Sequence, residues 1–183
     1  MVDRGFFVVI ACALLLASVA TIGATIAPWF GPATAVVVAW GLAEFFVRRR
    51  HMALPAIVLA VVFIGGLVSL GVGYIDHAGA GWVVGSAAAL FGAWLHWWRF
   101  RVPITVALGV AAAVGFVVTL LLAIVPQALN WPTPIALVAG VIVFALALRW
   151  DAADPARLTR KSDVAFWLHL LAAPLLVRAV FGA

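Results

Sequence analysis

The sequence predicts an all-α bundle of seven transmembrane helices with a cytoplasmic N-terminus, and three observations lead to this fold class. The 183 residues are 68% hydrophobic and 9% charged, whereas soluble globular domains are about a quarter charged. Apolar residues run for about 20 positions at a stretch, the length that one helix needs to cross a hydrocarbon core of ~30 Å. The connections between these runs are alternately basic and free of Lys and Arg. These features exclude a disordered chain, a disulfide-stapled scaffold, a nucleic-acid-binding module and a transmembrane β-barrel, whose strands alternate in polarity.

The first four spans are predicted at residues 6–26, 31–47, 52–74 and 79–98. The first is longer than the roughly 7–15 residues of a signal-peptide core and is followed by further runs, so we expect it to remain as a helix. It contains the single cysteine, Cys12, which has no partner in the chain and is expected to be a small buried hydrophobe. The second and fourth runs are shorter but still long enough to cross a bilayer. The third opens near Pro55, a residue that the first turn of a helix tolerates.

The last three spans are predicted at residues 102–125, 132–148 and 164–181. The fifth opens at Pro103, much as the third opens at Pro55. The seventh is interrupted by Pro174 and Arg178, so a re-entrant or interfacial helix would also fit there. We expect seven crossings, and the spans leave room only for a single integral membrane domain over residues 1–183.

The distribution of basic residues predicts the orientation of the bundle. The turns at 28–30, 76–77 and 126–131 contain no Lys or Arg. The other connections contain Arg48, Arg49, Arg50, Arg99, Arg101, Arg149, Arg157, Arg160 and Lys161, and Arg4 precedes the first run. Because basic residues favour the cytoplasmic side, the N-terminus is predicted inside and the C-terminus outside, with only Arg178 on the outer side. Tryptophans next to both sets of turns fit the aromatic belts of a membrane protein.

An internal period suggests three helical hairpins followed by one extra helix. Arg48, Arg99 and Arg149 recur about 50 residues apart, each closing a pair of apolar runs. Evenly spaced spans with basic inner loops would produce the same period without any duplication. Within the runs, Gly81 and Gly85 lie four residues apart, as do Ser69 and Gly73, so each pair would let a neighbouring backbone approach closely.

Three ionisable residues inside the predicted spans are the candidate polar site, because such residues are costly in lipid. Glu44, His96 and His169 each lie about 5 to 9 Å from the inner end of their helix, at ~1.5 Å per residue. If the second, fourth and seventh helices are neighbours, the three side chains could share a proton or bind a divalent metal such as iron or zinc. The alternative is structural: Glu44 pairs with Arg48, His96 belongs to an interfacial belt, and His169 bonds a backbone carbonyl.

The inner loop between the last two spans is a candidate cytoplasmic latch, because it concentrates charges of both signs. Its charged residues are Arg149, Asp151, Asp154, Arg157, Arg160 and Asp163. Asp154 before Pro155 suits a turn or a helix start, and Ser162 or Asp163 is predicted to cap the final helix. The functional alternative is a phosphate, lipid-headgroup or partner site at Arg157, Arg160 and Lys161.

The stretches Asp151-Ala152-Ala153-Asp154-Pro155 and Ser162-Asp163-Val164-Ala165-Phe166-Trp167-Leu168-His169-Leu170-Leu171-Ala172-Ala173-Pro174 carry a resemblance. They resemble the C-terminal part of a group of uncharacterised bacterial multi-pass inner-membrane proteins, and the turn Trp97-Trp98-Arg99-Phe100-Arg101-Val102-Pro103 is similar too. The resemblance covers about a quarter of the chain. It implies a bacterial inner membrane and no particular activity.

The predicted function is that of a small transport-related or accessory membrane protein. The alternatives are an intramembrane enzyme that depends on a metal or a histidine, and a structural subunit of a membrane complex. Transport predicts a polar path toward Asp76, His77 or Asn130, an enzyme predicts a closed pocket or a groove open to lipid, and a structural subunit predicts no connected polar cavity. The expected partners are membrane lipids, a second copy of the chain or another membrane protein, and no nucleic acid; no cofactor is identified.

Overall fold

The computed structural model describes residues 4–75 and 79–182, and all the regular structure in these ranges is helical. The seven α-helices are α1 (Arg4–Ala24), α2 (Phe30–Ala43), α3 (Ala53–Tyr74), α4 (Ala80–Phe100), α5 (Pro103–Ile124), α6 (Pro132–Ala152) and α7 (Arg160–Phe181). A π-helix, η1 (Glu44–Arg49), continues α2, and a short 3₁₀ helix, η2 (Pro126–Asn130), precedes α6. The seven predicted helices are confirmed, with ends that differ from the predicted ones by a few residues.

Six of these helical segments are long and apolar enough to cross a membrane. They are α1, α2 with η1, α3, α5, α6 and α7. The remaining helix, α4, is 21 residues long, but its glycines, its tryptophans and the polar end His96-Trp97-Trp98-Arg99 lower its hydropathy. Its length and its position between α3 and α5 match those of the other helices.

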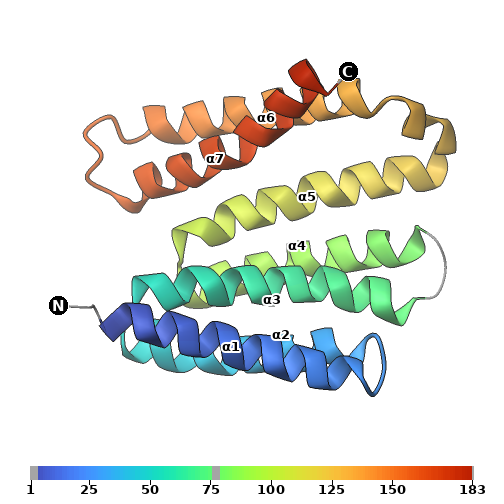
Figure 1. The fold of residues 1–183 in the computed structure, drawn as a ribbon. Coiled ribbons are helices and arrows are strands. Elements are labelled where there is room, and N and C mark those ends of the chain that lie inside the picture. The colour runs from blue at the N-terminus through green and yellow to red at the C-terminus, as the bar shows by residue number, and fades with distance from the viewer. Residues whose placement is uncertain (1–3, 76–78, 183) are drawn as a thin grey trace.

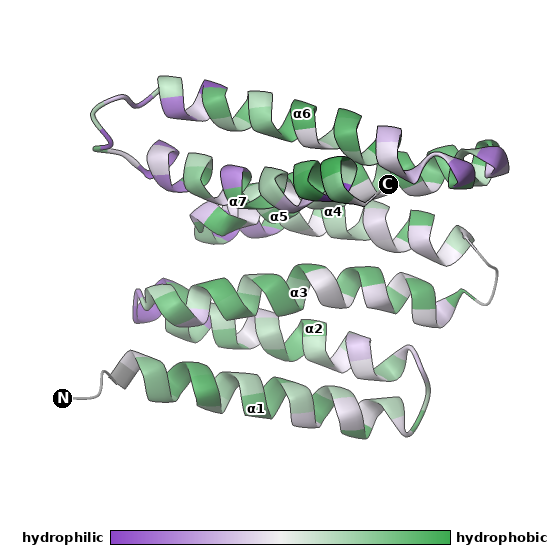
Figure 2. Cartoon of the chain, turned by 45° about the horizontal axis from the view of Figure 1, so that its top comes forward, coloured by the Kyte–Doolittle hydropathy of each residue, from purple (hydrophilic) through white to green (hydrophobic). Residues whose placement is uncertain are grey.

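The helices run side by side, and the chain ends lie at opposite ends of the bundle (Figure 1). One end, which we call the basic end, holds the N-terminus, the turns at 50–52 and 101–102 and the loop at 153–159. The opposite end holds the connections at 25–29 and 125–131 and the C-terminal end of α7. Hydrophilic residues are conspicuous at the basic end, in the turn after η1 and in the loop between α6 and α7 (Figure 2).

The packing divides the bundle into two groups. Helices α1 to α4 pack in chain order around a core centred on Leu59 and Phe63, with α1 also touching α3. Helices α5 to α7 form a second core centred on Val143 and Leu168, and α4 packs along α5 to join the groups. A smaller cluster at the basic end brings Trp167 of α7 against residues of the turn between α4 and α5.

The third predicted hairpin, α5 with α6, is not formed as a packed pair. These two helices barely touch, whereas α6 packs tightly against α7 and α7 packs against α5. The segment between α5 and α6 contains the five-residue helix η2, which separates the two helix ends. Helix α7 takes the place next to α5 that the hairpin would have filled.

Two of the turns at the basic end have the same backbone geometry. His51 and Arg101 both have positive φ angles, of 52° and 55°. Each is followed by an extended residue, Met52 or Val102, and then by the first residue of α3 or α5. A left-handed residue is a common way to end a helix. The shared turn supports the predicted likeness between the first two hairpins.

Glycines bring helix backbones close together between α3 and α4, and also between α1 and α2 at Gly31. A Cβ atom on Gly85 would collide with the carbonyl oxygen of Val68, and one on Gly71 would collide with the backbone of Gly85. A Cβ atom on Gly81 would lie 3.0 Å from the carbonyl oxygen of Gly71. The expectation that Gly81 and Gly85 admit a neighbouring backbone is therefore confirmed. Of the other predicted pair, Gly73 lies against the carbonyl of Pro28, while Ser69 is exposed.

We predict that Gly85→Ala lowers the free energy of unfolding in detergent by about 1–3 kcal/mol, because the new methyl group forces α3 and α4 apart. The matched control is Gly65→Ala on α3, since nothing lies within 4 Å of a Cβ at that position. The control is expected to be neutral or to stabilise by up to ~1 kcal/mol through helix propensity. Equal effects of the two substitutions, measured by thermal unfolding, would contradict the close contact.

Candidate functional site

Glu44 is bound at both carboxylate oxygens by an arginine of another helix. Arg99 Nε lies 2.8 Å from Oε1, and Arg99 Nη2 donates to Oε2 at 2.9 Å. This two-point contact links the end of α2 to the end of α4, 55 residues away in sequence. The Glu44 side chain is 32% exposed and that of Arg99 is 28% exposed, so the pair is partly shielded from solvent. Paired hydrogen bonds between a guanidinium and a carboxylate are the most directional ion pairs in proteins.

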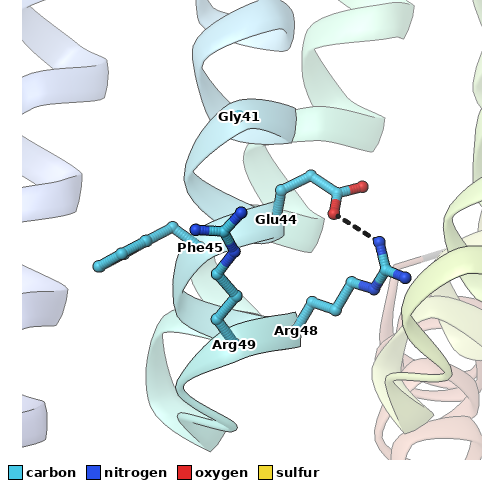
Figure 3. Close-up of a pocket in the computed structure, with 5 residues that line it drawn as sticks. All are labelled: Gly41, Glu44, Phe45, Arg48 and Arg49. Atoms are coloured by element: carbon cyan, nitrogen blue, oxygen red, sulfur yellow. Dashed lines mark hydrogen bonds and ion pairs between the residues drawn. The ribbon is translucent and has the colours of Figure 1, made fainter.

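The predicted contact between Glu44 and Arg48 is present, but it is the weaker of the two. Arg48 Nη1 lies 3.5 Å from Oε2, and its side chain is 57% exposed. The two residues point to the same side of η1, while Phe45 points to the other side (Figure 3). An open cavity of about 580 Å³ lies beside them, lined by Gly41, Glu44, Phe45, Arg48 and Arg49. Its wall thus holds the carboxylate of Glu44 and the guanidinium groups of Arg48 and Arg49.

His96 is completely buried between the first and second groups of helices. Its Nδ1 is 3.0 Å from Oγ1 of Thr105, which lies at the start of α5. Its ring packs against those of Trp40, Phe63 and Phe100, with centroids 6.2, 5.6 and 4.6 Å away. Nε2 makes no hydrogen bond to any described residue. The imidazole thus helps to hold the α4–α5 hairpin, and half of its bonding capacity is unused.

His169 lies in a different part of the bundle. It is partly buried on α7, and its ring contacts Phe144 of α6 at 5.5 Å. Trp167, two residues earlier, faces the turn between α4 and α5. Since successive helical residues are ~100° apart, His169 points to the opposite side of α7 from Trp167.

The three predicted site residues therefore do not form one site. Glu44 and His96 lie on facing helices, with Arg99 one turn beyond His96, but α7 packs chiefly against α6 and α5. Across residues 4–75 and 79–182, no three His, Cys, Asp or Glu side chains are grouped so that they could hold a metal ion. A metal ion shared by Glu44, His96 and His169 is therefore not supported among the described residues, because the packing of α7 directs His169 toward α6.

The predicted latch folds around Asp154. Its carboxylate accepts hydrogen bonds from the backbone N–H groups of Leu158 and Thr159, at 3.2 and 2.8 Å, and from the Thr159 hydroxyl at 2.7 Å. The hydroxyl bond, followed by the backbone bonds, lowers the pKa of Asp154 from its ordinary value, against the opposing effect of burial. Asp151 and Arg157 are 3.9 Å apart and exposed, so their pairing adds little.

Thr159, and neither Ser162 nor Asp163, caps the final helix. Its side chain accepts the backbone N–H of Lys161, and α7 begins at Arg160. The predicted caps are wrong because Asp154 binds Thr159 and so fixes the start of the helix before Ser162 and Asp163. Arg160 then fastens the loop to the bundle by donating from Nη1 to the carbonyl of Arg101 at 3.3 Å. Arg149, at the end of α6, and Asp163 are exposed.

A second cavity lies where the latch meets the two similar turns. It has a volume of about 430 Å³ and is lined by the turn after η1, the turn between α4 and α5 and the start of α7. The charged or titratable residues in its wall are His51, Arg101, Arg160 and Asp163. His51 and Arg101 are not identified as site residues from the sequence alone. The feature that could have indicated them is a basic residue at the same place in each of the two inner turns.

The remaining large cavities have mostly apolar walls, although Thr21 and Ser69 line one of them. One, of about 580 Å³, is an open groove between α5 and α6 lined only by aliphatic residues, a proline and Trp131. Hydroxyl groups in the helices, such as those of Ser18, Ser69 and Ser86, donate to carbonyls of their own helix. Asn130 is exposed at the opposite end, and Asp76 and His77 lie outside the described residues. Across the described part of the chain, a polar path toward the opposite end is not seen.

Comparisons with known proteins do not assign the site. The chain matches no family model, no curated protein and no solved structure. Its function is therefore inferred from the geometry and the sequence.

We predict that Arg99→Gln lowers the free energy of unfolding by about 1 kcal/mol, because it removes both contacts that join α4 to Glu44. Arg48→Gln is the matched control. The contact of Arg48 with Glu44 is longer and its side chain is more exposed, so we expect a loss of less than about 0.5 kcal/mol. Thermal unfolding in detergent at low salt compares the two. A larger loss for Arg48→Gln would mean that the helical neighbour, and not the partner on α4, is the main support of Glu44.

Proposed function

We propose that the chain is a seven-span integral protein of a bacterial inner membrane that acts as an accessory membrane protein. In this proposal its N-terminus is cytoplasmic and its C-terminus lies outside. It binds lipids or membrane partners through its surfaces, and does not move a solute or catalyse a reaction.

The lengths and polarity of the helices support membrane insertion. Six helical segments are apolar and 20–22 residues long, enough to cross a hydrocarbon layer of ~30 Å. Helix α4 is less apolar, yet it is antiparallel to the apolar helices α3 and α5 and packs along both. Large apolar side chains such as Val37, Phe91 and Ile142 are more than half exposed on the outside of the bundle. Such an exposed apolar surface would promote aggregation in water, whereas in a membrane it would contact the lipid chains.

The charges support the orientation. The N-terminus and all three basic connections share the basic end, and basic residues favour the cytoplasmic side of a membrane. Trp29, Trp82 and Trp131 lie near the opposite end and Trp98 near the basic end, all with exposed rings, as interfacial anchors do. The assignment to a bacterial inner membrane rests on the resemblance of the C-terminal stretch.

The accessory role rests on one observation: Glu44 and His96, two of the three ionisable residues of the candidate polar site, are engaged in holding helices together. Glu44 is held by Arg99 and Arg48, and His96 is hydrogen-bonded to Thr105. Farther along, the groove between α5 and α6 is lined by apolar residues, and the hydroxyls of Ser69 and Ser86 donate to carbonyls of their own helices. A protein that conducts a polar solute needs polar groups along the path, because unpaired polar groups in hydrocarbon are costly.

Proton transport is the second candidate, and one feature favours it. His96 has a free Nε2 although the side chain is fully buried. Histidine can take up and release a proton near neutral pH, and buried histidines contribute to proton relays in pumps.

Proton flux into proteoliposomes separates the two roles. With a pH-sensitive dye inside and an imposed pH gradient, the accessory role predicts the same flux as in empty liposomes. Flux above that background in the wild type, abolished by His96→Leu with Thr105→Val, would overturn the accessory role in favour of transport. The paired substitution removes the imidazole without leaving the threonine hydroxyl unpaired, so the fold is expected to persist.

A further inference from the structure

The second cavity at the basic end has an unusual combination of walls. Part of the wall is charged, with Arg160 and Asp163 at the start of α7 and His51 on the turn after η1. The rest of the wall is largely apolar and includes Ile57, Ile104 and Trp167. A cavity of about 430 Å³ with these walls fits a ligand that is itself polar at one end and apolar at the other.

The charged side offers donors for an oxyanion. Arg160 uses one Nη1 contact to hold the Arg101 carbonyl, and a guanidinium has five N–H donors in all. His51 and Arg101 add a titratable ring and a second cation to the wall. Helices α3 and α5 begin at this cavity without a capping side chain, so the positive ends of their helix dipoles lie at its wall. Phosphate esters are the natural partners of such a set.

The single carboxylate in the wall, that of Asp163, narrows the class of ligand further. Asp163 is exposed and faces the cavity on the same helical turn as Arg160. A headgroup with only negative charge would leave this carboxylate without a partner in the ligand. A headgroup that has an ammonium next to its phosphate would satisfy both the arginine and the carboxylate.

We propose that this cavity binds the headgroup of an aminophospholipid, with the phosphate at Arg160 and the ammonium at Asp163. The apolar wall then accommodates the first part of the acyl chains. The proposal rests on the membrane placement given above, in which the basic end lies at the level of the cytoplasmic headgroups, where basic residues meet lipid phosphates. It does not depend on whether the protein is an accessory protein or a transporter.

Native mass spectrometry of the delipidated protein in detergent, titrated with single lipids, tests the proposal. Phosphatidylethanolamine is expected to bind more tightly than phosphatidylglycerol. Arg160→Gln is expected to weaken phosphatidylethanolamine binding about tenfold, and Asp163→Asn to shift the preference toward phosphatidylglycerol. Lys161→Gln, next to the site but outside its wall, is the matched control and is expected to leave binding unchanged.

A second variant guards against a folding defect in Arg160→Gln, whose arginine also fastens the latch. His51→Asn changes another part of the wall, and asparagine tolerates the left-handed backbone at this position. It is expected to weaken lipid binding severalfold, while the helical circular dichroism and the melting temperature stay unchanged. Equal binding of both lipids, or equal effects of Arg160→Gln and Lys161→Gln, would overturn the site. Competition by glycerophosphoethanolamine or inorganic phosphate as strong as that by the lipid would overturn a lipid ligand in favour of a soluble phosphate compound.

Discussion

The ion pair between Glu44 and Arg99 is the interaction on which the arrangement of the basic end depends. A carboxylate at the end of an apolar helix needs a partner within the protein, because water and lipid headgroups reach it only in part. The cation comes from α4, with two contacts of 2.8 and 2.9 Å. This pairing fixes the end of α2 against the end of α4. It thereby sets the depth at which His96, one turn away on α4, meets Trp40 and Thr105.

The need of buried polar groups for partners within the protein also explains how the two helical groups are joined. Two polar contacts join the groups at the basic end, where His96 meets Thr105 and Arg160 meets the Arg101 carbonyl. Farther along, α4 and α5 are joined by apolar packing and by the contact of Ser86 with Thr119. In the proposed membrane placement, a hydrophobic driving force between helices is absent, and tight contact through glycines, as between α3 and α4, supplies packing instead. Most charged residues of the described chain thus lie at the basic end, and Arg178, in the last turn of α7, lies at the other.

Sequence reasoning predicted the helices well, because helix length and hydropathy follow from local composition. It also predicted the pairing of Glu44 with Arg48, which depends only on a spacing of four residues. It missed Arg99 as the main partner, misplaced His169 and expected a packed α5–α6 hairpin. Each error concerns either the rotation of a helix about its axis or the identity of the helix that packs against it. Depth along a helix can be counted from the sequence, whereas rotation and neighbours are set by tertiary packing.

The central claim is that seven helices cross the membrane with the basic end inside, and labelling of single cysteines tests it most directly. In a Cys12→Ser background, Tyr74→Cys and Leu129→Cys lie near the opposite end and Leu158→Cys lies in the latch, all at exposed positions. A membrane-impermeant maleimide applied to intact spheroplasts is predicted to label the first two and to label Leu158→Cys only after lysis. Labelling of Tyr74→Cys and Leu129→Cys from different sides would mean that α4 or α5 does not cross, and labelling of Leu158→Cys in intact spheroplasts would reverse the orientation.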